Sequence, residues 1–303
     1  MELTALPGAD IARQRIGAVR ERLGAVLFER VAGADGPGRR DRIHDAEGPR
    51  WFAEARPIRQ VHGDAAMFVG GLRALLLQSL HPLAMAGVEG HSGFRSDPWG
   101  RLQRTSYFLA VTTFGAASDA EAAVAKVRAI HERVRGTAPD GRPYRASDPH
   151  LLRWVHVAEV DSFLAAYQRY GAGRLDQAGR DAYLADAALV AEKLGVTDPP
   201  TTEAQLRTQL QAYRPELRST PAARAAARFM VLQPPLPLAA RPGYAALAAA
   251  AVGLLPWWAR WPLRLPYLPI AEATAGRVAG DGVVRTIRWA MAAPSGSAAQ
   301  PRG

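Results

Sequence analysis

The chain contains no cysteine, and this absence excludes several kinds of site. Disulfide bonds, thiolate-ligated haem, iron–sulfur clusters and cysteine-based zinc sites all need a thiol side chain. A metal held by the protein must therefore be bound by histidine or carboxylate side chains. The seven histidines of the sequence are the first residues to consider for that role.

Lysine is nearly absent too, since the sequence holds only Lys126 and Lys193. The net charge of +10 therefore comes from arginine, and the arginines are spread along the chain. A nucleic-acid-binding surface needs basic residues gathered in a patch. Abundant alanine together with arginine indicates a GC-rich coding sequence, so we expect no nucleic-acid partner.

The sequence also lacks an apolar run long enough to cross a bilayer. Its most apolar segment, residues 244–256, reaches a proline after about 12 residues, whereas a spanning helix needs about 20. The N-terminus has neither an apolar run behind a basic start nor a twin-arginine signal, so we expect a cytoplasmic protein. Residues 257–270 mix Trp, Arg and Pro and could contact a membrane interface peripherally. A packed pair of helices broken by proline explains them too, and is the interpretation we favour.

Helical periodicity runs through almost the whole chain, and we find no convincing alternating strand and no internal repeat. The pattern predicts an all-α fold, a single domain of about ten helices. Residues 33–50 are polar and Gly-rich and predict a loop, and the tail from Pro294 is expected to be disordered. We divide the chain into an N-terminal helix and loop (1–44), a main helical domain (45–270) and a C-terminal helix and tail (271–303).

Capping signals mark several helix ends. Asp97 and Asp148 each precede a proline and predict helix starts. Ser118 and Glu121 form an S-x-x-E capping box for a helix that ends at Gly136. Further helices are expected over 64–80, 98–115, 176–195, from Thr201 or Thr202 to Tyr213, and from Pro221 to Phe229.

The helix after Asp97 carries Arg101, Arg104 and Thr105 at spacings that place them on one face. Two arginines and a threonine on one helical face predict that this face forms the wall of a buried pocket. Arginines in an apolar setting need anions, for which Asp64, Asp97 or the carboxylates of a cofactor are candidates. A salt-bridge network at the helix start is the simpler alternative.

Two histidines fall inside apolar helical stripes. His131 lies at helical spacing from Val127 and Val134, and His156 lies on the apolar face of the next helix. Each is either a hydrogen-bonded core residue or a metal ligand. Glu159, three residues after His156, is close enough to orient the His156 ring.

The remaining histidines are weaker candidates. His81 ends a helix before a proline and either caps it or lines the pocket, and His91 lies in the loop that follows. His44, His62 and His150 are expected to be surface or local structural residues. Paired Glu-x-x-His, H-E-x-x-H, G-x-S-x-G, Walker and dinucleotide motifs are absent from the sequence.

A series of short motifs follows one another along the chain. HGD stands at 62–64, followed by GG-LRALLLQSLHP from Gly70 and by HS-F-DP-GRL-RT from His91 to Thr105. Then come I-H-x-x-V-x-G from Ile130, the DGRPYRASDP turn and LLRWVH ending at His156. In these motifs and their order, across residues 45–270, the chain resembles the MpaB/rubber-oxygenase catalytic domain family, formerly a domain of unknown function.

The resemblance implies an all-α, globin-related fold around a pocket for haem b. Members of that family include latex-clearing protein, which cuts the double bonds of polyisoprene with dioxygen, and an enzyme that cleaves the prenyl chain of a fungal meroterpenoid. By this resemblance His131 is the proximal iron ligand, and Arg101, Arg104 and Thr105 lie on the distal side. Arg101 would support its neighbours or a haem propionate.

One position departs from the latex-clearing type, which has a lysine where this chain has Arg104. That lysine can ligate iron, whereas a guanidinium stays protonated and is a poor ligand. We therefore expect a resting haem that is five-coordinate, bound to water or held by a second histidine, for which His81 and His156 are candidates. The substrate is expected to differ from rubber.

The sequence thus predicts a haem-b-dependent oxygenase that attacks C=C bonds of an apolar isoprenoid or lipid-like substrate with dioxygen. One alternative is a haem-binding protein without oxygenase activity: a peroxidase-like enzyme, a sensor or a carrier. The other is a haem-free helical interaction module. In that module the histidines only pack, and the Trp-rich segment docks on a membrane or a partner.

Overall fold

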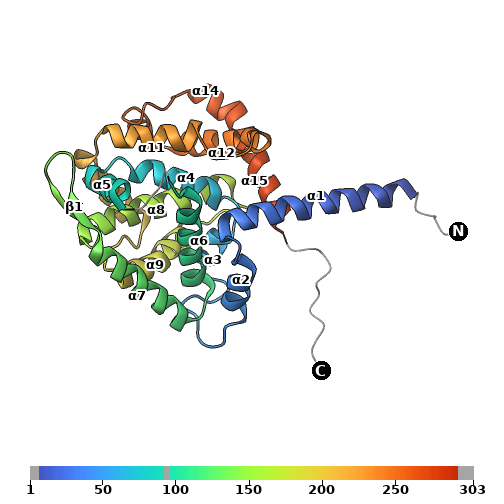
Figure 1. Ribbon diagram of the computed structural model, residues 1–303, viewed down its shortest axis with the longest axis horizontal. Helices are drawn as coiled ribbons and strands as arrows, with labels where there is room; N and C mark the ends of the chain where they lie inside the picture. The colour runs from blue at the N-terminus through green and yellow to red at the C-terminus, as the bar shows by residue number, and fades with distance from the viewer. Residues whose placement is uncertain (1–6, 92–95, 293–303) are drawn as a thin grey trace.

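Helices make up nearly all of the regular secondary structure in a computed structural model that describes residues 7–91 and 96–292, with side chains from residue 14 onward. Figure 1 shows a layered helical body from which the long helix α1 extends to one side. The all-α class expected from the periodicity is confirmed. The helices are α1 (Pro7–Ala32), α2 (Gly36–Asp45), α3 (Pro57–His62), α4 (Met67–Gln78), α5 (Pro82–His91), α6 (Pro98–Phe114), α7 (Ala117–Arg133), α8 (Pro149–Tyr170), α9 (Gln177–Leu194), α10 (Glu203–Tyr213), η1 (Arg214–Glu216), α11 (Pro221–Leu232), η2 (Leu238–Ala240), α12 (Arg241–Leu254), α13 (Trp257–Arg260), α14 (Pro269–Ala271), η3 (Glu272–Gly276) and α15 (Arg277–Met291).

The strands of the described chain form one short antiparallel hairpin between α7 and α8. β1 (Arg135–Thr137) pairs with β2 (Pro143–Arg145), with Gly136 opposite Tyr144. Gly141 turns the chain at a φ of +85°, which residues with a side chain rarely adopt. The turn expected here is therefore the tip of a hairpin.

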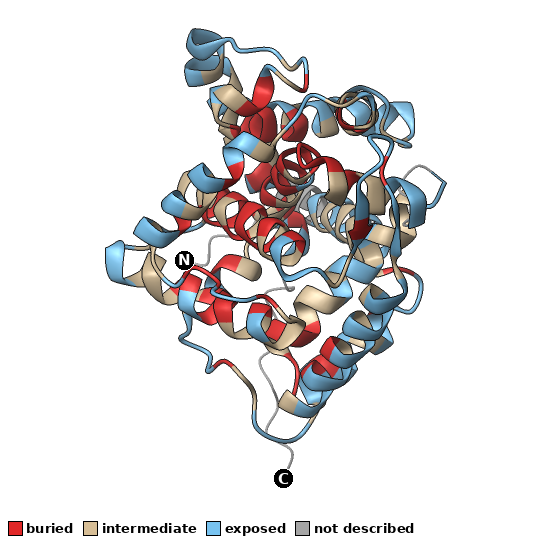
Figure 2. Cartoon of the chain, turned by 90° about the vertical axis from the view of Figure 1, so that its left-hand side faces the viewer, coloured by how far each residue is buried: buried red, intermediate tan, exposed pale blue. Residues whose placement is uncertain are grey.

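The core is built on α4, which packs along α8 and is covered by α12 (Figure 1). Leu76 and Leu77 of α4 and Trp154 of α8 have no solvent exposure and belong to one apolar cluster. Figure 2 shows the buried residues gathered in the middle of the body, with exposed faces on the outer helices. Burial of these apolar side chains supplies most of the driving force for folding.

The glycine pair of α4 has two different environments. A Cβ atom at Gly70 would lie 2.9 Å from Cδ1 and 3.2 Å from Cα of Phe163 on α8. A Cβ atom at Gly71 would meet nothing within 4 Å. Gly70 therefore allows the two central helices to approach closely, and Gly71 does not take part.

Several helices begin where the capping signals predicted. Asp97 accepts a hydrogen bond from a backbone N–H of the first turn of α6 at 2.9 Å, and Asp148 does the same for α8 at 2.8 Å. Thr202, one of the two candidates for α10, accepts from its first turn at 3.3 Å. Each side chain satisfies an N–H group that a helix start leaves unpaired.

The predicted capping box of α7 is wrong. No side chain caps this helix, and the N–H of Ala117 donates to the carbonyl oxygen of Pro49 at 2.7 Å. A loop far away in the sequence thus replaces Ser118 and Glu121. The helix ends before Gly136, which lies in β1.

Residues 33–50 are not a loop throughout, because α2 occupies part of them. Arg50 donates hydrogen bonds to the carbonyl oxygens of Ile43 and His44, both at 3.0 Å. These bonds satisfy carbonyl groups that the end of α2 leaves unpaired. A side chain beyond the helix therefore supports it, and the composition of the segment did not reveal this.

The packed, proline-broken helix pair that we favoured for the Trp-rich segment is confirmed in part, because Ala259 and Arg260 of α13 are buried and so is Leu263. Trp257, Trp261 and Ile270 are 65%, 86% and 82% exposed, although Trp258 is half-buried. Within the described ranges, no helix combines the length and the apolar character needed to cross a bilayer. The tail from Pro294, predicted to be disordered, lies outside the described residues.

Gly70→Ala should lower the free energy of unfolding by about 1–3 kcal/mol, because the new methyl group overpacks against Phe163. Gly71→Ala is the matched control and should raise it by about 0.5–1 kcal/mol, because alanine loses less backbone entropy than glycine in a helix. Urea unfolding followed by circular dichroism measures both. Equal effects of the two substitutions would contradict the close approach of α4 to α8.

Candidate functional site

The three polar residues predicted to form a distal wall lie in the first half of α6. Arg101 is half-buried, whereas Arg104 and Thr105 are exposed. Nη1 of Arg104 lies 3.2 Å from Oδ2 of Asp97, an exposed salt bridge at the helix start, which is the simpler alternative to an arginine in the wall of a buried pocket. Burial, followed by repulsion from Arg104, lowers the pKa of Arg101. Their catalytic roles stay a prediction, and residues 92–95, before α6, lie outside the described residues.

Asp64, the other expected partner, pairs with an arginine of α15 instead. Its Oδ1 accepts hydrogen bonds from Nη2 of Arg288 at 2.8 Å and from the N–H of Ala66 at 2.7 Å. Its Oδ2 accepts from the N–H of Ala172 at 3.0 Å. Asp64 therefore ties the start of α4 to the end of α8 and to α15, which is a structural role.

His131 lies in the last turn of α7, on the same buried face as Ala120 and Val124. Ile130, the residue before it, is 40% exposed and lies off this face. The Nδ1 atom of His131 is buried and has no hydrogen-bond partner among the described residues. Burial lowers the pKa of His131 more than Glu132 raises it, so the imidazole is neutral at neutral pH.

His156 and Glu159 place two perturbed titratable groups on α8. His156 is buried, as predicted, and burial lowers its pKa to about 4. Its Nε2 is buried without a hydrogen-bond partner in the described structure, so Glu159 does not form a hydrogen bond with this nitrogen. Burial raises the pKa of Glu159 from 4.5 to about 7, so this carboxyl group exchanges its proton near neutral pH.

His62 points inward, so of its two expected placements, surface or local structural, the surface one is wrong. Its Nδ1 lies 2.8 Å from Oγ1 of Thr113. Its ring packs edge-on against Phe163 and Tyr183, with centroids 5.5 and 5.9 Å away. Burial lowers the pKa of His62 to about 3, and its Nε2 is buried without a partner in the described chain. The HGD motif marks this residue, but its spacing does not show that α3 faces α8 and α9.

Tyr183 of α9 is a second interior residue that the sequence did not identify. It has no solvent exposure, and its hydroxyl group has no hydrogen-bond partner among the described residues. Burial, and then the charges of Glu159 and Asp161, raise its pKa well above the usual range. No motif surrounds Tyr183, so only the packing of α9 reveals its contact with His62.

His81 is buried at the bend between α4 and α5. Its Nε2 lies 3.3 Å from Oε2 of Glu216, and its ring packs beside Trp154 and Tyr213. His150, in the first turn of α8, contacts the same carboxylate at 2.9 Å. The structure thus groups His81 with His150 and Glu216, and a role of His81 at a haem stays a prediction.

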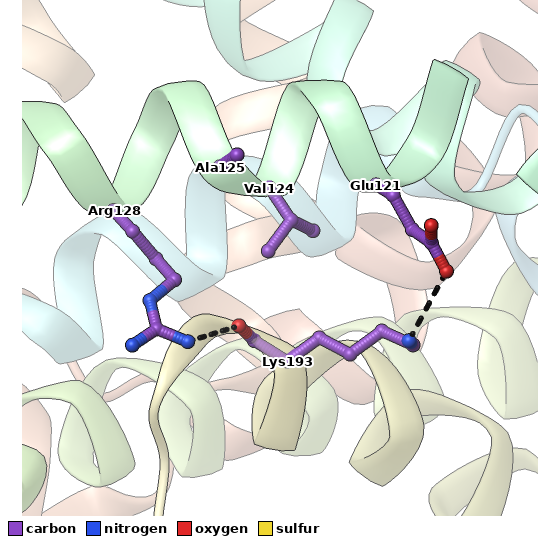
Figure 3. Close-up of a pocket in the computed structure, with 5 residues that line it drawn as sticks. All are labelled: Glu121, Val124, Ala125, Arg128 and Lys193. Carbon is purple, nitrogen blue, oxygen red and sulfur yellow. Dashed lines mark hydrogen bonds and ion pairs between the residues drawn. The ribbon is translucent and has the colours of Figure 1, made fainter. Parts of the chain in front are cut away.

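A pocket of about 450 Å³ opens between α7 and α9 (Figure 3). Nζ of Lys193 lies 3.6 Å from Oε1 of Glu121, and Nη1 of Arg128 donates to the carbonyl oxygen of Lys193 at 3.3 Å. Val124 and Ala125 complete its lining. None of the predicted site residues lines this pocket, so the pocket is not part of the predicted site.

Comparison with known families identifies the class of the chain. The family model described as "ER-bound oxygenase mpaB/B'/Rubber oxygenase, catalytic domain" matches residues 59–289. The match covers α4 to α12 entirely and includes every predicted site residue. The chain belongs to this family of oxygenase catalytic domains, as the order of its motifs predicted.

Similar curated proteins add no activity to this assignment. Uncharacterized protein Mb2261 of Mycobacterium bovis and uncharacterized protein Rv2237 of Mycobacterium tuberculosis are each 34% identical to the chain over 100 residues. The aligned segment is 33% of this chain and 37% of each relative, so the chain matches little more than a third of their length. No solved structure matches the chain significantly.

The raised pKa of Glu159 should appear in the pH dependence of stability. A carboxyl group whose folded pKa exceeds its unfolded value contributes stability that is present below pH 4.5 and is lost as the pH rises to about 7. Glu159→Gln removes this loss. The unfolding free energy of the variant minus that of the wild type should therefore grow by about 3 kcal/mol between about pH 4 and pH 8.

Urea unfolding at the two pH values measures this difference. Glu54→Gln, at an exposed position, is the matched control for the change of Glu to Gln. A constant difference for Glu159→Gln would contradict a buried carboxyl group with a raised pKa.

Proposed function

We propose that this chain is a haem-b-dependent oxygenase that holds iron with His131 and attacks C=C bonds of an apolar isoprenoid or lipid-like substrate with dioxygen. The observation that carries the proposal is the match to an oxygenase catalytic domain over residues 59–289. The buried, unpartnered Nδ1 of His131 supports the choice of ligand within that domain. The relation to the globin fold is part of the same proposal.

The residues present fit a haem held by imidazole. The chain has no cysteine, and burial keeps His131 in the neutral form that binds metals. A buried polar atom without a partner costs free energy, which a bound cofactor would recover. When bound, haem would supply the iron chemistry that activates dioxygen.

Helix α6 would supply the polar groups of the distal side. Arg101 is a half-buried cation and would pair with a carboxylate such as a haem propionate. The hydroxyl group of Thr105 and the guanidinium of Arg104 can donate hydrogen bonds to the reacting oxygen atoms. Arg104 would then leave Asp97, which is feasible because the pair is exposed and solvent weakens it.

A haem-binding protein without oxygenase activity is the second candidate. A peroxidase-like enzyme, a sensor or a carrier would need His131 as the iron ligand. It would not need polar side chains on the distal side of the haem that are positioned toward reacting oxygen atoms. The exposure of Arg104 and Thr105 favours this candidate. Consumption of dioxygen with an alkene-bearing substrate separates it from the oxygenase.

The apolar substrate class is also the reason to propose peripheral membrane contact. Trp257, Trp261 and Ile270 expose large apolar side chains on neighbouring segments of the chain. Tryptophan is favoured at membrane interfaces, and the net charge of +10 favours anionic lipid. Such contact would bring the protein to the phase in which an isoprenoid or lipid dissolves.

His131→Ala should abolish haem loading because it removes the proposed iron ligand. Haem content per chain, measured from the Soret absorbance after reconstitution, gives the result. His44→Ala is the matched control, since His44 is exposed on α2, and should load haem as the wild type does. Normal haem content in the His131 variant would remove the ligand assignment.

Dioxygen uptake tests the reaction itself. The haem-loaded protein should consume dioxygen with an unsaturated isoprenoid lipid and should not do so with its saturated analogue, because the C=C bond is the proposed point of attack. An oxygen electrode measures both rates. Haem loading without uptake on alkene-bearing lipids would favour the second candidate.

Trp261→Ala should reduce binding to anionic lipid vesicles, because it removes the most exposed of the tryptophans in this segment. Cosedimentation with vesicles measures the bound fraction. Ile130→Ala removes an exposed apolar side chain from α7 and should leave binding unchanged. Wild-type binding by the Trp261 variant, or none by the wild type, would contradict the membrane contact.

A further inference from the structure

Three side chains of types that can ligate a metal, from separate segments, meet beside the start of α8. His81 lies at the bend between α4 and α5, His150 lies in the first turn of α8, and Glu216 ends η1. Nε2 of His150 is 2.9 Å from both carboxylate oxygens of Glu216, and Nε2 of His81 is 3.3 Å from Oε2. One ligand atom from each of the three lies within 4.8 Å of the other two.

The two separations between histidine and glutamate lie in the range found between neighbouring ligands of one metal ion, and the two imidazole nitrogens are at most 4.8 Å apart. Zinc binds histidine nitrogen and carboxylate oxygen at about 2.0–2.2 Å, so two ligands at a right angle lie about 2.9 Å apart and two at a tetrahedral angle about 3.3–3.4 Å apart. The observed 2.9 and 3.3 Å match these two values.

The neighbours of the cluster hold its rings in place. The ring of His81 packs beside Trp154, and the ring of His150 lies 4.7 Å from that of Tyr213. The hydroxyl group of Tyr213 donates to the carbonyl oxygen of His150 at 2.8 Å. Fixed rings reduce the entropy lost when a metal binds, as the supporting residues of metal sites do.

The alternative is a carboxylate hydrogen-bonded to two histidines. Burial lowers the pKa of His81, although Glu216 raises it. Burial alone would raise the pKa of Glu216, but its hydrogen bonds to His150 and His81 outweigh burial and lower it. Arg142 is close enough to lower the pKa of His81 and would oppose a cation, so an ion must gain more from its ligands than this repulsion costs.

We propose that His81, His150 and Glu216 bind a divalent transition-metal ion of the zinc type, at a site separate from the haem proposed at His131. Two imidazoles and one carboxylate are ligands that zinc commonly takes, with a further position left for water. The ion would join the α4–α5 bend, the start of α8 and η1. His81 would then be committed to this ion and would not serve as a second haem ligand.

Titration of the chelator-treated full-length protein with Zn²⁺ tests the site. Calorimetry should show one ion per chain in the wild type, and added Zn²⁺ should raise the melting temperature. Loss of a supporting partner of a metal site costs roughly 10–100-fold in affinity, so loss of a direct ligand should cost at least as much. His150→Ala and Glu216→Gln should each show that loss of affinity and no thermal shift.

Glu216→Gln separates the metal site from the hydrogen-bonded alternative, because glutamine keeps an acceptor for both rings but binds metals poorly. His44→Ala controls for exposed histidine, and His131→Ala controls for the haem; both should bind Zn²⁺ as the wild type does. Equal Zn²⁺ affinity in the wild type and the two ligand variants, or no binding by the wild type, would overturn the proposal. Because the titration needs no haem, its failure leaves the oxygenase proposal standing.

Discussion

The arrangement of the central helices depends on one buried cation, Arg73 of α4. It is 4% exposed, and its Nη1 lies 2.7 Å from Oδ2 of Asp161 and donates to Oγ of Ser162 at 2.6 Å, both on α8. Its Nε donates to the carbonyl oxygen of Leu254 at the end of α12 at 3.0 Å. A buried guanidinium is tolerated only when its charge and its donors are satisfied. Arg73 therefore fixes α4, α8 and α12 relative to one another, and α8 carries His156 and Glu159.

A second constraint is that the interior keeps its histidines neutral. His62, His131 and His156 all have lowered pKa values because burial disfavours the imidazolium. Each also has a buried ring nitrogen without a partner in the described structure. The proposed haem ligand, His131, is one of these three.

Local chemistry decided which features could be predicted from the sequence. Asp97 and Asp148 cap helices through contacts within four residues, and the family motifs lie in short stretches of sequence. Both the helix caps and the family could therefore be predicted from the sequence. The start of α7 depends on Pro49, and Asp64 binds an arginine 224 residues away, so no local pattern could show either. His62 faces Tyr183 only because α3 packs on α9. The cluster of His81, His150 and Glu216 likewise exists only in three dimensions.

The most direct measurement of the central claim is the absorption spectrum of the purified, haem-reconstituted protein in the oxidised state, after reduction with dithionite and after addition of carbon monoxide. A Soret band that shifts with carbon monoxide is the predicted result, because histidine ligation on one side leaves the other side of the iron accessible. Absence of a Soret band after reconstitution would contradict the haem-dependent function and leave a helical protein whose buried histidines serve another purpose.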